Sequence, residues 1–319
     1  MIAYHAASAS TYRFPTLSAA TDVVYFIHYA FVAMSGYVCG WYYSSPAYSG
    51  GLVRARRRLL TRAVKLLVLL VVSNVILYSA GIGYSLTRLR GTIDSWPDVF
   101  TNFVFSMNGK LVAFEILYFI ALLLAAVAVL LGRLNPAQAA VAAVVVALLK
   151  PWAGAAPFLS MGLLGVALGL HVGTRQDANK YRIPAWGYAI CPPILVLLHW
   201  NAGLLKTLYL AAGPLYVLPL FCEVLLWCGA FIWLGGLGLK IVNAQLRVYA
   251  QYTLVAYMLQ MLLVRIGASL MESVPVHAWM QYSIIAAGSI VGLALLLKLL
   301  HIVRARWSRF DQLYKLFFA

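Results

Sequence analysis

Residues 22–43 read DVVYFIHYAFVAMSGYVCGWYY, followed by SSPAYSGGLV at 44–53 and RARRRLLTRAVK at 54–65. The first segment is long enough to cross a bilayer, since a membrane helix needs about 20 apolar residues. The Ser- and Gly-rich middle segment predicts a turn, and the third segment is a basic cluster that opens the next apolar run. His28, Ser35 and many aromatic residues lie in the first segment, and a helix that only faced lipid would not need them.

The composition indicates a membrane protein. Of the 319 residues, 64% are hydrophobic and 10% are charged, whereas soluble proteins carry about 25% charged residues. The net charge of +16 arises from basic residues at the ends of apolar runs, a pattern that sets membrane orientation and that we do not attribute to nucleic-acid binding. We therefore predict an all-α, polytopic transmembrane helical bundle of about nine to ten membrane helices, forming a single domain over residues 1–319.

Apolar runs place the predicted membrane helices along the chain. They lie at 21–43, 64–84, 111–132, 136–150, 155–173, 184–205, 212–239, 250–270 and 279–302, with a fragment at 1–10 that looks like the end of a helix whose start is missing. The short run 136–150 predicts, with 155–173, either a helical hairpin or a broken helix.

The basic residues predict which side of the membrane each end of the chain occupies. A cytoplasmic cluster at 54–65 brings most other Lys and Arg residues to the same side and places the C-terminus there. The C-terminal segment RARWSRFDQLYKLFFA alternates basic and aromatic residues, as an amphipathic surface helix would, but the favoured interpretation is a simple basic anchor that sets orientation.

Ionisable residues inside the predicted spans are candidates for function, because each costs roughly 2.5–3.5 kcal/mol at the bilayer centre. Glu115 either faces a polar cavity or pairs with an arginine of another helix, whereas structural pairing is favoured for Glu223 and His199. A histidine can accept a proton from a hydroxyl and return it to a thiolate, which makes His5 and His28 candidates for catalysis. The ionisable residues within spans are His28, Glu115, His199, Glu223, Arg265 and Lys298.

Small residues in the apolar runs predict packing. The cysteines form no CxxC pair and are expected to be small buried hydrophobes; they are Cys39, Cys191, Cys222 and Cys228. The segment GLLGVALG predicts close helix packing, within the chain or between chains, at Gly162, Gly165 and Gly169.

The basic cluster at 54–65 has the chemistry that phosphate binding needs. Arg58 and Arg62 are four residues apart, so they share a helix face and could hold a phosphorylated ligand through bidentate hydrogen bonds. Arg54, Arg57 and Lys65 flank that face. The alternative is a topology determinant that contacts anionic lipid headgroups.

Five segments resemble, in order, motifs of the acyltransferase family 3 integral membrane proteins. MIAYHA at 1–6 resembles the apolar run that leads to a histidine at the end of the first helix of that family. FIHYAFVAMSGYVCG at 26–40 resembles the second helix, and RRRLLTRAVKLL at 56–67 the arginine-rich start of the third. LSMGLLGVALG at 159–169 and YAQYTLVAYMLQMLL at 249–263 resemble later segments.

This resemblance implies a bundle of about ten helices that transfers an acyl group, usually acetyl from acetyl-CoA, to hydroxyls of an envelope glycan or another surface acceptor. It implies that His5 is the catalytic base or transient acyl carrier. The donor phosphates would be held by Arg57, Arg58, Arg62 and Lys65. The substrate passage would be lined by His28, Ser35, Tyr37, Glu115, Tyr257 and Gln260. Acetyl-CoA or another acyl-CoA is the expected donor and no metal is expected; the expected location is the bacterial inner membrane.

The chain departs from the family pattern at three points. Most of the first helix is missing, with the charged residue that usually precedes the histidine; Gln260 stands where a late histidine is frequent, and Ala30 where proline is usual. Two other hypotheses therefore stay open. One is a transporter or flippase of a polar or lipid-linked solute, with Glu115, Glu223, Arg265 and Gln260 as its polar lining, and the other is a catalytically inactive relative.

Overall fold

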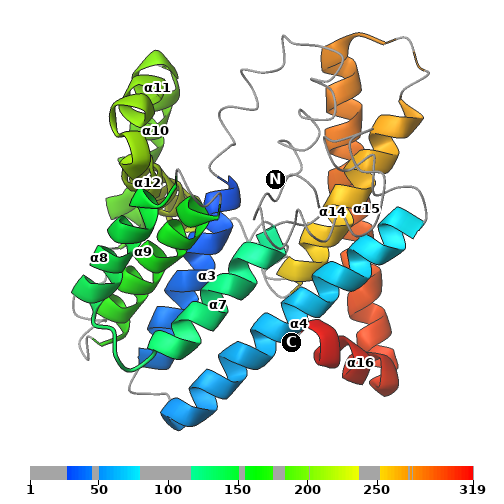
Figure 1. Ribbon diagram of the computed structural model, residues 1–319. Coiled ribbons are helices and arrows are strands. Elements are labelled where there is room, and N and C mark those ends of the chain that lie inside the picture. The colour runs from blue at the N-terminus through cyan, green and yellow to red at the C-terminus, as the bar shows by residue number, and fades with distance from the viewer. Residues whose placement is uncertain are drawn as a thin grey trace. The chain divides into compact units, whose positions relative to one another are not determined.

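A computed structural model shows the chain as α-helical wherever it is described, with no strand in that part (Figure 1). The structure describes residues 27–44, 50–79, 116–150, 155–174, 184–200, 202–236, 252–271, 274 and 276–318, although some side chains within these ranges are not described. The all-α prediction is confirmed for this part. The helices are α3 (Ile27–Ser44), α4 (Gly51–Ser79), α7 (Ile116–Leu130), α8 (Pro136–Leu148), α9 (Ala156–Gly173), η3 (Ala185–Tyr188), α10 (Cys191–Trp200), α11 (Ala202–Ala211), η4 (Gly213–Tyr216), α12 (Val217–Gly236), α14 (Thr253–Leu270), α15 (Ala278–Arg306) and α16 (Ser308–Phe318).

Four helical segments of the described chain are long and apolar enough to cross a membrane. They are Gly51–Ile76, Ala156–Gly173, Gly213–Gly236 and Met280–Arg306. The chain is therefore a membrane protein, as its composition predicted. The helix α3 has 18 residues but is not one of these four, because His28, Ser35 and its tyrosines lower its hydropathy.

The chain falls into two compact units, and each is described by itself. One unit comprises His28–Trp233, and the other comprises Met1–Ile27 with Leu234–Ala319. The first unit contains the helices from α3 to the greater part of α12, and α14, α15 and α16 belong to the second.

A close backbone contact joins α3 to α9 in the first unit. A Cβ atom added to Gly165 would meet the carbonyl oxygen of Ala33, and one added to Gly40 would lie 2.5 Å from the carbonyl oxygen of Val166. Further along, a Cβ atom added to Gly173 would lie 2.8 Å from the carbonyl oxygen of Trp41, so the contacts advance in the same direction along both helices and α3 and α9 are parallel. The glycines of GLLGVALG thus pack within the chain, one of the two arrangements that the sequence allowed.

The helices α8 and α9 form a packed pair, which decides between the hairpin and the broken helix. Asn135 and Gln138 form a capping box at the start of α8, with proline in the first turn. The Ser160 hydroxyl donates a 2.8 Å hydrogen bond to the Ala143 carbonyl, which joins the two helices. The hairpin prediction is therefore confirmed.

The helix α4 packs against α7 and begins earlier than the predicted span at 64–84. Ala55, Leu59 and Ala63 recur every four residues and are buried, so they form the packed face of α4. The Arg56 guanidinium donates a 2.8 Å hydrogen bond to the Leu131 carbonyl just beyond α7. The helix extends back to Gly51 because arginine is a good helix former, so the basic cluster belongs to the helix itself.

The predicted single span at 184–205 is wrong. The described residues there form a 3₁₀ turn, η3, and two helices, α10 and α11, of 10 residues each. Proline at 192 and 193 suits the first turn of α10, where the missing N–H groups would have no helical partner. This forces the helix to start at Cys191, seven residues later than the apolar run begins.

The cysteines are free thiols whose surroundings differ. Cys39 and Cys191 are buried, as the sequence predicted, and Cys228 is half-buried. Cys222 is exposed, so the prediction is wrong for that residue, because its position on α12 faces away from the packed side that holds Glu223 and Val224.

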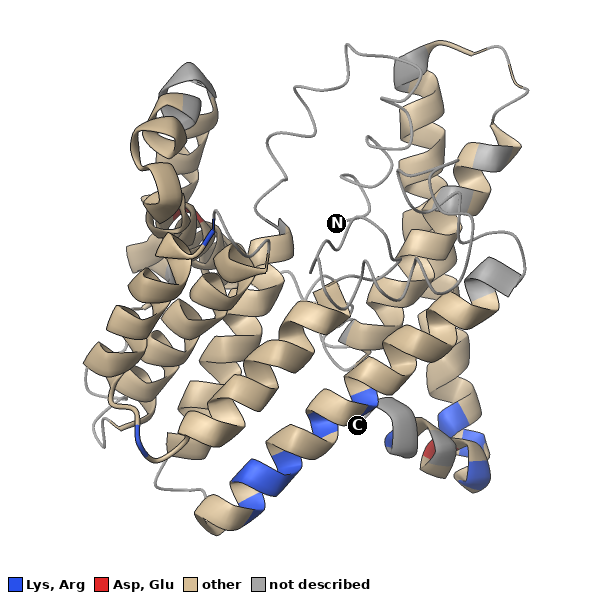
Figure 2. Cartoon of the chain, in the orientation of Figure 1, with Lys and Arg blue, Asp and Glu red and all other residues tan. Residues whose placement is uncertain are grey.

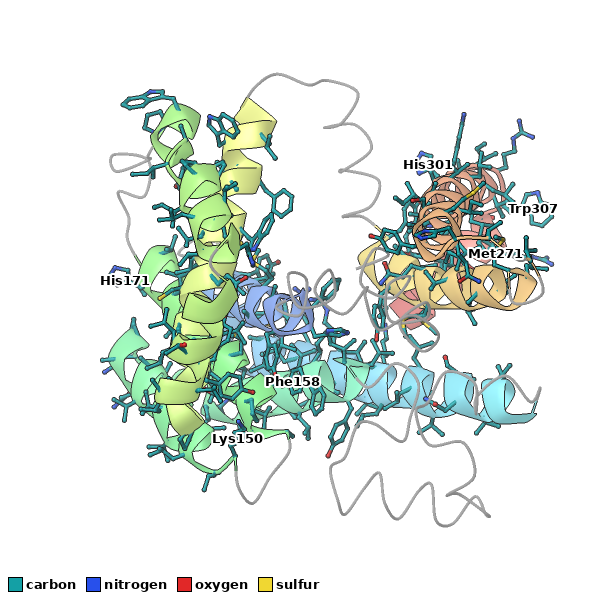
Figure 3. The ribbon with its side chains drawn as sticks, turned by 90° about the horizontal axis from the view of Figure 1, so that it is seen from above. Lys150, Phe158, His171, Met271, His301 and Trp307 are labelled. Atoms are coloured by element: carbon teal, nitrogen blue, oxygen red, sulfur yellow. The ribbon has the colours of Figure 1, made fainter. Side chains whose placement is uncertain are left out.

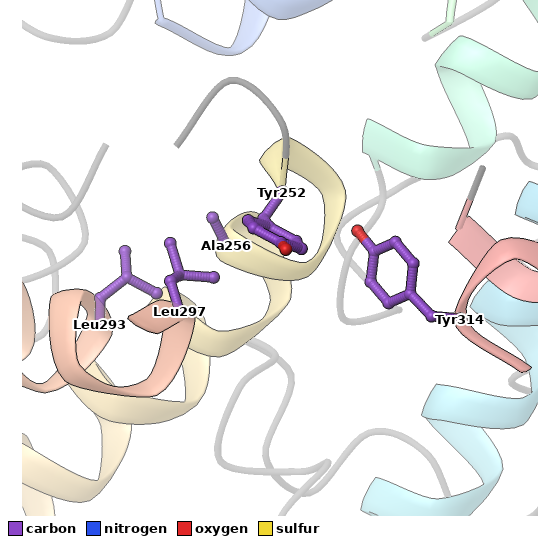
Figure 4. Packing of buried hydrophobic residues seen from close by; sticks show 5 residues of the cluster. All are labelled: Tyr252, Ala256, Leu293, Leu297 and Tyr314. Carbon is purple, nitrogen blue, oxygen red and sulfur yellow. The ribbon is translucent and has the colours of Figure 1, made fainter. Parts of the chain in front are cut away.

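In the second unit, a buried cluster joins α14, α15 and α16 (Figure 4). Tyr252 lies directly before α14 and packs with Leu293 and Leu297 of α15. Tyr314 of α16 meets the Tyr252 ring edge-on, with ring centroids 5.7 Å apart. The C-terminal segment is therefore a helix that an aromatic side chain docks on the second unit.

The α3–α9 contact predicts that a methyl group is not tolerated there. We expect Gly165→Ala to lower the free energy of unfolding by about 1–3 kcal/mol, the usual cost of overpacking, because the added Cβ meets the backbone of Ala33. A Cβ on Gly288 of α15 meets nothing within 4 Å, so Gly288→Ala serves as the control and should be neutral or stabilising. Thermal unfolding in detergent measures both, and equal effects would contradict the close contact.

Docking of α16 should depend on pH through Asp311. Hydrogen bonds from Lys315 and Arg304 hold the pKa of the Asp311 carboxyl below its ordinary value. A lowered pKa stabilises the docked helix above the unfolded pKa, and this contribution is lost as pH falls through the folded pKa. We expect α16 to undock on acidification in that range, measured by Trp307 fluorescence, and Asp311→Asn to remove the pH dependence; an unchanged profile in the variant would refute this.

Candidate functional site

A basic face runs along the first half of α4. The α4 basic face consists of Arg54, Arg57, Arg58, Arg62 and Lys65 (Figure 2). The four arginines are exposed and Lys65 is half-buried. Because a helix turns once in 3.6 residues, Arg54, Arg58 and Arg62 form a stripe that runs beside the face that packs on α7, since each directly precedes one of its buried residues, Ala55, Leu59 and Ala63. The shared face predicted for Arg58 and Arg62 is confirmed.

Most guanidinium groups of this face have no counter-charge. Arg54, Arg57 and Arg58 make no hydrogen bond or ion pair with any residue that the structure describes, whereas Lys65 has a partner. Like charges one turn apart repel by about 0.2–0.5 kcal/mol for each pair. Guanidinium groups have forked donors whose geometry suits phosphate.

Arg56 belongs to the same cluster, but its side chain forms a hydrogen bond within the protein. Its Nη2 atom bonds the Leu131 carbonyl at the end of α7, and a cation is favourable at a helix C-terminus. The sequence did not single out Arg56. Arg56 lies at the edge of the buried face formed by Ala55, Leu59 and Ala63. This helical position is the signal that would have separated it from the exposed arginines.

The predicted passage residues of α3 lie in one helix, but they differ in what their side chains do. His28 is in the first turn and half-buried, and it interacts with another residue. The Ser35 hydroxyl donates a 2.8 Å hydrogen bond to the Phe31 carbonyl of its own helix. The backbone of Tyr37 lies against Gly165 and Gly169. A passage lined by these residues stays a prediction.

The other predicted site residues lie outside the described part of the chain or in the second unit. His5 and Glu115 lie outside the described residues, as does the side chain of Arg265. Tyr257 and Gln260 are buried in α14, in the second unit. Gln260, which stands where the resembled family often has a histidine, thus places a polar amide in a buried position. This residue has an interaction partner.

A column of aromatic rings, which the sequence did not reveal, crosses the first unit beside His28. The Tyr29 ring stacks on Phe158 of α9 with centroids 4.5 Å apart, and Phe158 stacks on Phe119 of α7 at 4.1 Å. At its other end the Tyr29 hydroxyl is 2.9 Å from that of Tyr216, whose ring lies under the Lys150 ammonium. The column holds the first turn of α3 against α7, α9 and η4.

Glu223 joins three helices inside the first unit. It is 5% exposed and lies near the middle of the span Gly213–Gly236. One carboxylate oxygen accepts a short hydrogen bond from Tyr209 of α11, and the other lies 3.2 Å from Nε2 of His199 on α10. The ring nitrogen is close enough for an ion pair but is not aligned for a hydrogen bond. The structural pairing that the sequence favoured for Glu223 and for His199 is present, and the structure shows that the two residues pair with each other; Tyr209 was missed.

No described residues gather into a metal centre. The structure holds no group of three or more His, Cys, Asp or Glu side chains in its described part that could bind a metal ion.

Comparison with protein-family models, with curated proteins and with solved structures finds no match for this chain.

The Glu223 contacts predict that the hydroxyl of Tyr209 is important for stability. We expect Tyr209→Phe to cost about 1–3 kcal/mol, because it leaves a buried carboxylate oxygen without a donor. In a Glu223→Leu background the same change should cost much less, since no carboxylate remains. Tyr188→Phe, whose hydroxyl makes no hydrogen bond among the described residues, is the matched control. Thermal unfolding in detergent measures the cycle, and equal costs in both backgrounds would rule out this role.

Proposed function

We propose that this chain is a membrane-embedded acyltransferase of the acyltransferase family 3 type. It transfers an acyl group, in the first instance acetyl from acetyl-CoA, to hydroxyls of an envelope glycan or another surface acceptor. The observation that carries the proposal is the α4 basic face, a stripe of exposed guanidinium groups at one end of a membrane-spanning helix. The ordered resemblance of five sequence segments supports the same reading.

The donor explains why such a stripe would be useful. Acyl-CoA carries phosphate groups at one end and the thioester at the other, so a basic stripe can hold the phosphates while the acyl group extends toward the protein. Arg58 and Arg62 are one turn apart and both exposed, which suits adjacent phosphate oxygens. Arg57 and Lys65 are placed beside them.

The chemistry needs one base and a route for the acceptor. In the proposed reaction His5 takes the proton from the acceptor hydroxyl, the oxygen attacks the thioester carbonyl, and the C–S bond breaks. The departing thiolate of CoA then takes the proton from the imidazole, so that protons balance. His28, Ser35, Tyr37, Glu115, Tyr257 and Gln260 are the proposed lining of the route.

The wider setting belongs to the same proposal. The chain forms a bundle of nine to ten membrane helices in the inner membrane of a bacterium, with its C-terminus in the cytoplasm, where acyl-CoA is available. The parallel run of α3 and α9 agrees with the alternation of spans that this orientation requires.

Transfer of labelled acetyl from acetyl-CoA to an envelope glycan fraction, by the purified full-length protein, tests the proposal. We expect Arg58→Gln with Arg62→Gln to raise KM for acetyl-CoA roughly tenfold to a hundredfold, as loss of charge-assisted hydrogen bonds predicts. Arg58→Lys keeps the charge but loses the fork, so its effect should be smaller. Arg133→Gln removes an equally exposed charge outside the basic face and is the control. An unchanged KM in the double variant would exclude donor binding at α4.

The same assay separates the base from the donor site. His5→Ala should abolish transfer while the protein still inserts in the membrane and still binds CoA. An active His5→Ala variant would overturn the assignment of the base but leave the α4 site standing.

A second candidate function is transport of a polar or lipid-linked solute. Glu223 favours it, because a buried carboxylate near the middle of a span, paired with a histidine, is a feature of proton and solute pathways. Solute uptake by proteoliposomes without acetyl-CoA, lost in Glu223→Gln, would support this candidate. Acetyl transfer with no such uptake would support the first.

A further inference from the structure

The corner between α15 and α16 is held in one arrangement by its own contacts. The Arg304 guanidinium lies 3.9 Å from the Tyr314 ring centroid and donates to Asp311 at 2.7 and 2.8 Å. Lys315 meets the same carboxylate at 2.6 Å. Because these contacts link the end of α15 to the middle of α16, the residues between the helices are presented in a fixed way.

These contacts leave an excess of positive charge at the corner. Asp311 is the only acidic residue after Glu272 in the sequence, and Arg304 and Lys315 already neutralise it. Arg306 and Arg309 are exposed, and neither has a hydrogen bond or ion pair with the described residues. Their charges are therefore available to an external anion.

An aromatic side chain stands between these two arginines. Trp307 is 67% exposed and projects outward at the corner (Figure 3). The candidate span Met280–Arg306 ends directly before it. That span has 27 residues, or about 40 Å of helix, against a hydrocarbon core of about 30 Å. Its end therefore lies at the depth of the lipid headgroups, where tryptophan is enriched.

We propose that the corner formed by Arg306, Trp307 and Arg309 is a docking surface for anionic phospholipid. The two guanidinium groups contact the headgroup phosphate, and the indole ring lies at the boundary between headgroup and acyl chain. This surface is a function separate from donor binding at α4. The exposed indole ring and the unpaired arginines together favour a lipid over a soluble anion, because a soluble anion would make no apolar contact with the ring.

Tryptophan quenching by brominated lipid tests this surface directly. The full-length protein is placed in phosphatidylcholine nanodiscs that contain a small fraction of brominated phosphatidylglycerol or, in the other arm, brominated phosphatidylcholine. The fluorescence of Trp307 is obtained by subtracting the fluorescence of Trp307→Phe from that of the unmodified protein. We expect stronger quenching by phosphatidylglycerol, and we expect this preference to fall about fivefold for each arginine removed in Arg306→Gln and Arg309→Gln.

The controls separate a specific surface from general charge. Arg133→Gln removes one exposed arginine elsewhere and should keep the preference. Equal quenching by the two lipids in the unmodified protein would overturn the proposal. Loss of the preference when inorganic phosphate is added at constant ionic strength would also overturn it, because the corner would then be a site for a soluble anion.

Discussion

The contact between the backbones of α3 and α9 determines the arrangement of the first unit. Where two helices meet through glycine, main-chain atoms take the place of side chains at the interface. Inside a membrane the hydrophobic effect does not drive helices together, so dispersion contacts between these close backbones stabilise the pair. Gly36 and Gly40 of α3 supply one side of this contact and the GLLGVALG segment supplies the other. With α9 also packed on α7 and α8, the orientation of the α3 side chains follows from it. Tyr29 reaches Phe158 for this reason.

Arginine has two roles in this chain, and the presence of a hydrogen-bond acceptor within the protein distinguishes them. Arg56 and Arg304 donate to a carbonyl and a carboxylate, so their charges are used in holding helices together. The exposed arginines of the α4 basic face and of the α15–α16 corner have no such partner among the described residues. Since guanidinium is charged at all physiological pH values, these groups keep their charge. The proposed anions differ: a soluble phosphorylated donor at α4 and a lipid headgroup at the corner.

The sequence predicted features that depend on nearby residues. The all-α class and the shared face of Arg58 and Arg62 follow from composition and helical spacing, and both were confirmed for the described residues, whereas the α8–α9 hairpin was one of two arrangements that the sequence left open. The division of this segment into α10 and α11 was missed because the prediction followed the high overall hydropathy of 184–205, although Pro192, Pro193 and Asn201 interrupt the apolar run. Tyr209 was missed because its importance comes from Glu223, on another helix. The predicted functions of His5 and Glu115 depend on contacts beyond the described residues.

The parallel run of α3 and α9 constrains how the chain is threaded through the membrane. Two helices that point the same way must be joined by a segment that crosses back an odd number of times. Between them the described part of the chain holds three helices, α4, α7 and α8, which is consistent with this requirement. With only 13 residues, or about 20 Å of helix, α8 is shorter than the hydrocarbon core. Packing against α9 shields this short helix, so the hairpin is a means of crossing back with a helix shorter than the hydrocarbon core.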